Sequence, residues 1–161
     1  MATIDDGRRD FDFELGRWNV HNRRLLTRLQ GCTEWQEFAS FTDVIPLLGG
    51  LGNLERWSSP AFADGKPFEA FALRIFQPAT RLWSIHWADD RRCALDPPVV
   101  GRFEDGHGQF FCDDVLDGRP IRVRFDWKDI TPTSARWEQA FSPDGGKTWE
   151  TNWTMDFTRT A

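Results

Sequence analysis

The sequence predicts an all-β protein in which about ten antiparallel strands follow one short N-terminal helix. The dipeptide Asp-Gly, a strong signal for a tight hairpin turn, recurs at 64–65, 105–106, 117–118 and 144–145. Between these turns, apolar and polar residues alternate, as they do in strands that bury one face. A flat sheet of so many strands would leave exposed edges, so we expect a closed barrel or a sandwich.

The position of each element follows from its pattern. Residues 5–15 favour a helix, because acidic residues come early and Phe11, Phe13 and Leu15 offer an apolar side. The strands are expected at roughly 17–29, 33–45, 52–58, 67–77, 81–88, 99–104, 108–116, 119–128, 134–142 and 148–159. No linker, low-complexity tract or repeat divides the chain, so residues 1–161 are expected to form a single domain.

The composition argues against several classes of function. Hydrophobic residues make up 40% and charged residues 28% of the chain, and no apolar run approaches the ~20 residues that span a bilayer. A formal net charge of −5 without a basic cluster argues against nucleic acid as a partner. The first residues lack the basic and apolar stretches of a secretory signal, so a cytoplasmic location is expected. Nine Trp and fourteen Phe supply aromatic surface, whereas the lack of Tyr excludes tyrosine chemistry.

The cysteines and histidines do not form a recognisable metal site. The three cysteines, at positions 32, 93 and 112, have no C-x-x-C spacing and are expected to be reduced thiols. His21, His86 and His107 are isolated from one another and from any cysteine at ligand spacing. The sequence therefore predicts neither a bound metal nor a cofactor.

Two segments match known motifs in whole or in part. Residues 142–149 fit S-x-D-x-G-x-T-W, the Asp box of sialidase-type propellers, but a propeller needs several copies and a longer chain. We interpret this segment as a hairpin turn with Trp149 packed against Phe141.

Gly50-Leu51-Gly52 begins like a dinucleotide fingerprint, yet position 55 is Glu and no helical pattern follows. The connector 46–53 is interpreted as a flap over a cavity mouth or as an ordinary loop.

The turns also predict which residues lie opposite one another. Two-residue turns are expected at 30–31 and 117–118, and a further turn around 78–79, which leaves Arg74 and His86 on one face. A slip of one residue would invert the faces. The expected pairs are Arg24 with Glu37, Asn22 with Ala39, Phe110 with Phe125, Cys112 with Val123, Leu73 with Ile85, and Phe71 with Trp87.

A short helix, then Gly16-Arg17-Trp18, then many antiparallel strands with Arg159 near the end of the last one, resembles the calycin pattern of lipocalins and fatty-acid-binding proteins. In that pattern the tryptophan closes the barrel floor and the arginine lies across it. Over nearly its whole length the chain is similar to a bacterial lipocalin-like family, the DUF1579 type. The residues that carry this similarity are 11–25, 46–53, 137–142 and 149–153. The resemblance implies a lipocalin-like barrel, with Gly16, Trp18 and Arg159 in structural roles, and no particular activity.

Strand parity then identifies the interior of such a barrel. From Trp18 and Arg159 the residues expected inside are Val20, Asn22, Arg24, Leu26, Trp137, Gln139, Phe141, Trp149, Thr151, Trp153 and Met155. A polar patch of Arg24, Glu37 and Gln139 is expected to orient a ligand headgroup. The candidate ligand-binding residues are Arg24, Glu37, Arg74, His86, Trp137, Gln139 and Trp153.

The leading hypothesis is a binding protein for a small apolar or amphipathic molecule held inside the barrel, with a homodimer as a possible assembly. One alternative is an enzyme of lipocalin-like fold, such as an isomerase, cyclase or hydratase, with His86 or Glu37 as acid or base. Haem binding through His86 or His107 is another. The last is a barrel filled by its own side chains that acts as an interaction module.

Overall fold

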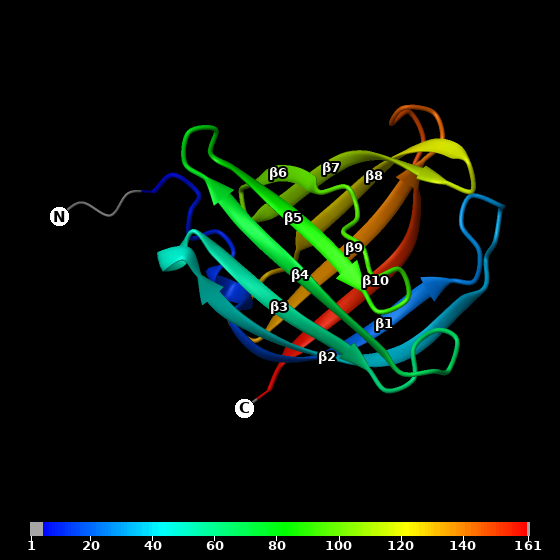
Figure 1. Cartoon of the computed structure of the whole chain (residues 1–161), viewed down its shortest axis with the longest axis horizontal. Coiled ribbons are helices and arrows are strands. Elements are labelled where there is room, and N and C mark those ends of the chain that lie inside the picture. Colours follow the sequence, from blue (N-terminus) through cyan, green and yellow to red (C-terminus); the bar gives the residue numbers. More distant parts are fainter. Residues whose placement is uncertain (1–4, 161) are drawn as a thin grey trace.

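The computed structural model describes residues 5–160, and these form one closed barrel of antiparallel strands (Figure 1). Each strand pairs with the next along the chain, and β1 closes the barrel by pairing with β10. The predicted all-β class and the closure into a barrel are therefore confirmed. The strands are β1 (Gly16–Leu25), β2 (Trp35–Leu47), β3 (Gly52–Ser59), β4 (Phe68–Gln77), β5 (Leu82–Asp89), β6 (Val99–Glu104), β7 (His107–Leu116), β8 (Arg119–Lys128), β9 (Ser134–Ser142) and β10 (Glu150–Arg159).

The helix predicted over residues 5–15 is wrong, because this segment contains only a single 3₁₀ turn, η1 (Asp12–Glu14). Gly7 has φ +95°, a conformation that an α-helix cannot contain. Phe11 and Glu14 are almost completely buried in the end of the barrel. Tertiary packing of these side chains, rather than helix propensity, determines the conformation here.

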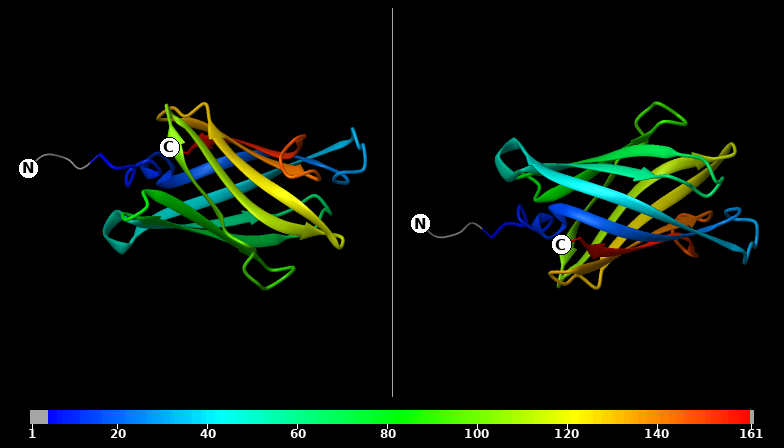
Figure 2. Two further views of the ribbon diagram at one scale, coloured as in Figure 1. Left: turned by 90° about the horizontal axis from the view of Figure 1, so that it is seen from above. Right: turned by 90° about the horizontal axis from the view of Figure 1, so that it is seen from below.

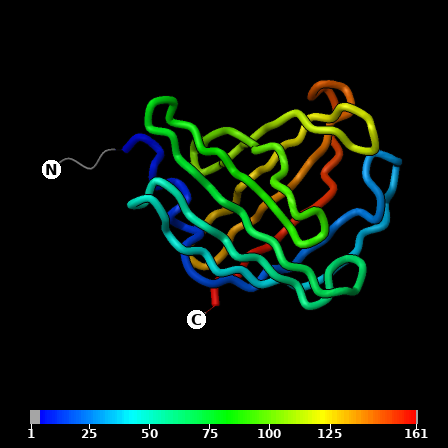
Figure 3. Tube along the Cα trace, in the orientation of Figure 1, coloured from blue at the N-terminus to red at the C-terminus, as the bar shows by residue number. Residues whose placement is uncertain are grey.

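The two ends of the barrel differ. Figure 2 shows residues 5–15 entering at one end, while the turns that join β1 to β2, β7 to β8 and β9 to β10 lie at the other. We call these the closed end and the open end. The first and last described residues both lie at the closed end (Figure 3). A second 3₁₀ turn, η2 (Leu48–Gly50), places the glycine-rich connector 46–53 at the closed end as well, and therefore away from the open mouth.

Aromatic side chains fill the closed end. The Phe11 ring lies 5.0 Å from Trp83 and 4.9 Å from Phe103, in both cases edge to face, and it also contacts Trp127 and Phe110. Edge-to-face pairs of this kind are favourable beyond the area that they bury. The segment 5–15 therefore acts as a plug that seals one end of the lumen.

Trp18 and Arg159 close the barrel at this end in the arrangement expected from the sequence. The Arg159 guanidinium carbon lies 4.1 Å from the centroid of the Trp18 ring, which is buried. Arg159 also donates hydrogen bonds to the carbonyl oxygens of Leu15 (2.6 Å) and Phe13 (2.5 Å). Gly16 has φ +108°, and a Cβ there would lie 2.8 Å from the Arg159 Nη1, so glycine is required both by the backbone and by the close approach.

The register of one hairpin is confirmed and that of two others is wrong by one residue. Phe110 faces Phe125 as predicted from the turn at 117–118. In the first hairpin Arg24 faces Gln36, not Glu37, because pairing ends at Leu25 with Trp35 and residues 26–34 form a longer connection. The predicted partner of Asn22 was Ala39, and the actual partner is Phe38.

In the hairpin of β4 and β5, Arg74 faces Ile85 and Leu73 faces His86, so the predicted pair of Leu73 with Ile85 is wrong. The pair of Phe71 with Trp87 is wrong for the same reason, since residues 78–81 form a longer turn than expected. A slip of one residue exchanges the two faces of a strand pair. Arg74 consequently lies inside the barrel, and His86 lies outside.

Three residues expected inside the barrel lie elsewhere. Leu26 follows the end of β1 and is 47% exposed. Trp149 precedes β10 and packs outside, 4.6 Å from the Arg124 guanidinium and against Phe111, rather than against Phe141. A β-bulge between Thr151 and Trp153 changes the parity at this point, so that Asn152 instead of Thr151 contacts the inward-facing Gln139.

The segment that matches the Asp box is a turn, as predicted. The Asp144 carboxylate accepts hydrogen bonds from the backbone N–H groups of Lys147 (3.0 Å) and Thr148 (2.8 Å) and from the Thr148 hydroxyl (2.6 Å). The bond from the Thr148 hydroxyl is the main reason that the pKa of Asp144 is lowered to about 2. Within residues 5–160, no helix has the length and apolar character needed to cross a membrane.

Candidate ligand-binding cavity

The half of the lumen toward the open end contains a cavity of about 340 Å³. This volume lies within the range of small-molecule pockets, roughly 300–1,000 Å³. Side chains from β1, from β3 to β10 and from the connections that follow β1 and β5 line it, and most of them are apolar. The aromatic lining residues are Trp57, Trp87, Phe125, Trp127, Trp137, Phe141, Trp153 and Phe157.

Trp153 is the central residue of the aromatic wall. Its ring centroid lies 5.7 Å from that of Trp137, 6.1 Å from Trp57 and 6.3 Å from Trp87, each time near a right angle. Its Nε1–H donates a hydrogen bond of 3.0 Å to the Asn22 side-chain oxygen. Buried hydrogen bonds of this kind fix the orientation of a ring. The wall is thus held in place before any ligand binds.

A buried charged cluster forms the floor of the cavity. Arg74 on β4 contacts two carboxylates: Glu14 of the plug, at 2.9 Å, and Glu55 on β3. Its Nη1 also donates to the Asn53 side-chain oxygen (3.0 Å), and the Thr42 hydroxyl donates to Glu55 (2.8 Å). All three charged side chains are almost fully buried. A buried charge persists only when it is paired, and the cluster satisfies this condition by joining the plug to the barrel wall.

The cluster holds two carboxylates against one guanidinium, which sets its protonation state. Burial raises the pKa of Glu14 well above its usual value, and the neighbouring Glu55 adds to this effect, while Arg74 opposes it. Two carboxylates in one sealed site do not both ionise readily. We therefore expect Glu14 to retain its proton at neutral pH beside the ion pair of Arg74 with Glu55, so that the floor carries no net charge.

The structure brings five of the seven predicted ligand-binding residues together around the cavity. Arg24, Arg74, Trp137, Gln139 and Trp153 all line it. Their role in binding remains a prediction.

The other two predicted residues lie on the outer surface. Glu37 is exposed and lies 3.6 Å from Arg23 and 3.3 Å from His21. His86 faces outward, with its Nε2 3.1 Å from the Ser84 hydroxyl. Neither residue reaches the cavity, so they cannot act there as acid or base.

His107, the other histidine considered for haem, lies in an outer polar cluster and contacts Asp126 at 2.8 Å. The structure therefore places neither histidine where it could bind a ligand in the lumen. In the described part of the chain, no group of three or more His, Cys, Asp or Glu side chains is arranged to hold a metal ion.

Four residues of the floor and the wall, Glu14, Glu55, Trp57 and Trp87, were not among the predicted site residues. Alternation along β3 places Glu55 on the same face as the inward Trp57, and this was a usable signal for a buried carboxylate that needs a cation. No comparable signal exists for Glu14, because the plug has no regular period. Trp87 was correctly placed on the same face as Ile85, but the wrong register paired it with the outward-facing Phe71.

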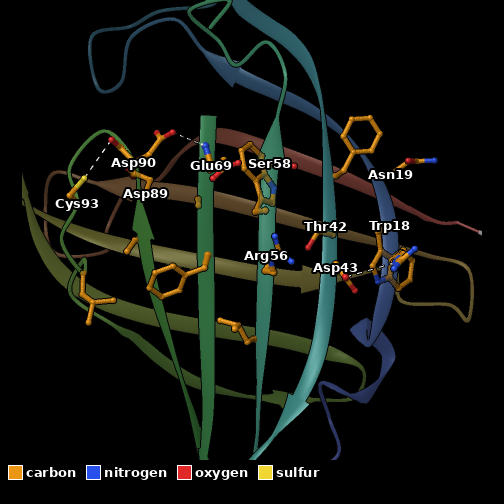
Figure 4. Close-up of a pocket in the computed structure, with 18 of the residues that line it drawn as sticks. Trp18, Asn19, Thr42, Asp43, Arg56, Ser58, Glu69, Asp89, Asp90 and Cys93 are labelled. Atoms are coloured by element: carbon orange, nitrogen blue, oxygen red, sulfur yellow. Dashed lines mark hydrogen bonds and ion pairs between the residues drawn. The ribbon is translucent and has the colours of Figure 1, made fainter. Parts of the chain in front are cut away.

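A second, broader hollow lies outside the barrel, between residues 88–95 and the outer faces of β1 to β4 (Figure 4). Its volume, about 1,160 Å³, exceeds that of the lumen, but it is an open groove rather than an enclosure. Figure 4 shows Asp43, Arg56 and Glu69 on three neighbouring strands, and Phe41 and Phe71 are partly exposed there. An enclosed site removes more of a ligand from water, so the lumen is the better candidate for small molecules.

The sequence matches no family model and no curated protein. Solved structures are similar in fold. The S-type phycobiliprotein lyase of Guillardia theta has a TM-score of 0.59 and 10% identity, over 94% of this chain and 90% of the lyase. A de novo designed fluorescence-activating β-barrel has a TM-score of 0.51 and 13% identity, over 98% of this chain and all of the design. A redesigned β-barrel gives 0.52 and 10%, over 99% and 100%. These likenesses show the barrel fold.

Proposed function

We propose that this protein binds a small amphipathic molecule in the open half of its barrel. The observation that carries the proposal is the cavity of about 340 Å³, with aromatic walls and a few polar groups. A lumen filled by its own side chains would leave no such space. Here the plug and the closed-end aromatic residues fill only one half, so the filled-barrel alternative has less support.

The barrels of similar fold give further support. One is named as a fluorescence-activating barrel and another as a phycobiliprotein lyase, and both names are consistent with a barrel of this shape that binds a small molecule. This support comes from analogy of fold alone. The lipocalin-like assignment, the cytoplasmic location and the homodimer remain predictions from the sequence.

A fluorescence titration with a neutral apolar dye, N-phenylnaphthylamine, tests the proposal. The emission of the dye rises when it leaves water, so we expect a saturable increase at equimolar stoichiometry. Ligand that binds only the native state should also raise the melting temperature, with about 2.7 kcal/mol of added stability at a hundredfold excess over Kd. No saturable signal and no stabilisation would refute lumen binding.

A pair of valine substitutions locates the bound dye. Val123 points into the cavity and Val100 points outward from β6, where it is partly exposed. Val123→Phe should fill part of the cavity and weaken dye binding about tenfold, whereas Val100→Phe should leave it unchanged. Equal effects of the two variants would place the dye outside the lumen.

A further inference from the structure

Arg24 occupies an unusual position at the open end of the cavity. It lies on β1 with the same inward parity as Trp18 and Asn22, and it lines the cavity. Its guanidinium carbon lies 5.3 Å from the Trp153 ring centroid and 5.4 Å from that of Phe62. The cation is thus held between aromatic rings, which limits its contact with water.

No carboxylate pairs with Arg24 among residues 5–160. Its Nε is buried and has no hydrogen-bond partner. Asp89 is near enough to favour the charged form, but its carboxylate already accepts hydrogen bonds from the Trp87 Nε1 and from the backbone N–H groups of Arg91 and Arg92. The predicted partner, Glu37, is on the outer surface. Arg24 is therefore a partly desolvated cation with an unused donor.

A second cation lies at the same mouth. Arg28 lines the cavity, and its only hydrogen bond among the described residues goes to the Leu25 carbonyl (3.4 Å). Burial lowers the pKa of Arg24 to about 10, and repulsion by Arg28 adds to this lowering, so Arg24 remains charged at neutral pH. Bound negative charge would relieve both effects.

The charges on the floor do not offset those at the mouth. Arg74 is neutralised by its two carboxylates, and with one proton retained on that pair the floor has no net charge. The rim also holds Arg92 and three aspartates, Asp89, Asp96 and Asp114, so its formal charges balance. Arg92 pairs with Asp96 at 2.8 Å, and Asp114 accepts a hydrogen bond from the Val115 N–H. The buried Nε of Arg24 is still without an acceptor, and this unused donor beside an aromatic cavity points to an anionic ligand.

We propose that Arg24 binds the anionic headgroup of the ligand, and that the ligand is a small amphipathic carboxylate whose apolar part lies against Trp87, Trp137 and Trp153. The inference rests on the proposed function, since it names the ligand class of the same cavity. A carboxylate accepts two parallel N–H bonds from a guanidinium, a geometry that a hydroxyl group cannot reproduce. It would supply the acceptor that the buried Nε lacks.

Three ligands of equal chain length test this assignment: decanoate, decanol and decylammonium, each displacing N-phenylnaphthylamine at pH 8. We expect decanoate to bind at least tenfold more tightly than decanol, and decylammonium to bind most weakly. Arg24→Gln should remove the preference for decanoate while decanol affinity changes less than about threefold. Arg24→Lys should keep part of the preference, because it retains the charge without the planar fork.

Arg23→Gln is the matched control. Arg23 is the adjacent residue on β1, but it points outward toward Glu37, so its loss should leave the preference unchanged. Dye binding by Arg24→Gln shows that the variant is folded. If wild type binds decanoate and decanol equally, or if Arg23→Gln and Arg24→Gln act alike, the anion assignment is overturned while lumen binding stands. If neither the dye nor any of the three ligands binds, the proposed function itself fails.

Discussion

Replacing Arg74 with methionine would leave two buried carboxylates at the floor without a cation. One of them already holds a proton, and the other must gain one or remain charged in a sealed site. Protonating a glutamate with its ordinary pKa of about 4.3 costs about 3.7 kcal/mol at pH 7 and about 1 kcal/mol at pH 5. This agrees with the ~3–5 kcal/mol usually lost when one partner of a buried ion pair is removed. We expect Arg74→Met to lose about 3–4 kcal/mol at pH 7.

Urea denaturation followed by tryptophan fluorescence at pH 7 and pH 5 measures this loss. In the variant, the carboxyl group left without a cation binds a proton more tightly in the folded state than in the unfolded state. The free energy of unfolding of the variant is therefore highest below pH ~4 and falls as the pH rises. The deficit relative to wild type should therefore shrink to about 1 kcal/mol at pH 5. A deficit of equal size at both pH values would refute the electrostatic account and would indicate lost packing against Phe11 and Trp127 instead. Adding Glu55→Gln to Arg74→Met should recover most of the loss at pH 7.

Three further predictions concern the closed end and the thiols. Trp18→Ala should cost about 3–5 kcal/mol, because it removes a buried ring and its contact with Arg159, and an unchanged urea midpoint would contradict the structural role of this pair. Titration of the denatured protein without reductant should find three free thiols. In the native protein at pH 7, Cys112 should react far more slowly than Cys32, because burial raises the pKa of Cys112 to about 12 whereas hydrogen bonds lower that of Cys32. Comparable labelling rates would contradict this order.

The sequence predicted the strands well and the register of their hairpins less well. A strand is identified by local alternation of apolar and polar residues. Nearly every expected strand begins and ends within two residues of the observed one. A register depends on the length of the turn. Asp117-Gly118 has the residues that a two-residue turn demands, so that register was correct. Gln30-Gly31 lies inside a longer connection, and nothing in the sequence around it shows where the pairing of β1 with β2 ends.

The site was predicted only in part for the same physical reason. Parity from Trp18 and Arg159 correctly placed Arg24, Trp137 and Trp153 on the inner face, because parity survives an error in register. The pairing of Arg24 with Glu37 did not survive, because a pair requires both parity and register. The floor cluster joins Glu14 to Arg74 across 60 residues of sequence, and a contact between such distant positions leaves no local pattern.

The junction between β5 and β6 differs from every other junction of the barrel. These strands pair only at Trp83, Ser84 and Ile85, and beyond this point residues 90–98 cover the gap, held by a hydrogen bond from the Asp96 N–H to the Trp87 carbonyl (2.9 Å). The shortest ladder of the barrel costs the least free energy to separate, so this seam is a second place, besides the open end, where the barrel can open. Asp96, Pro97 and Cys112 border the cavity at this seam. Amide hydrogen exchange should therefore be faster here than at the other strand junctions, and the breathing of this seam would give a bound ligand a second way out of the cavity.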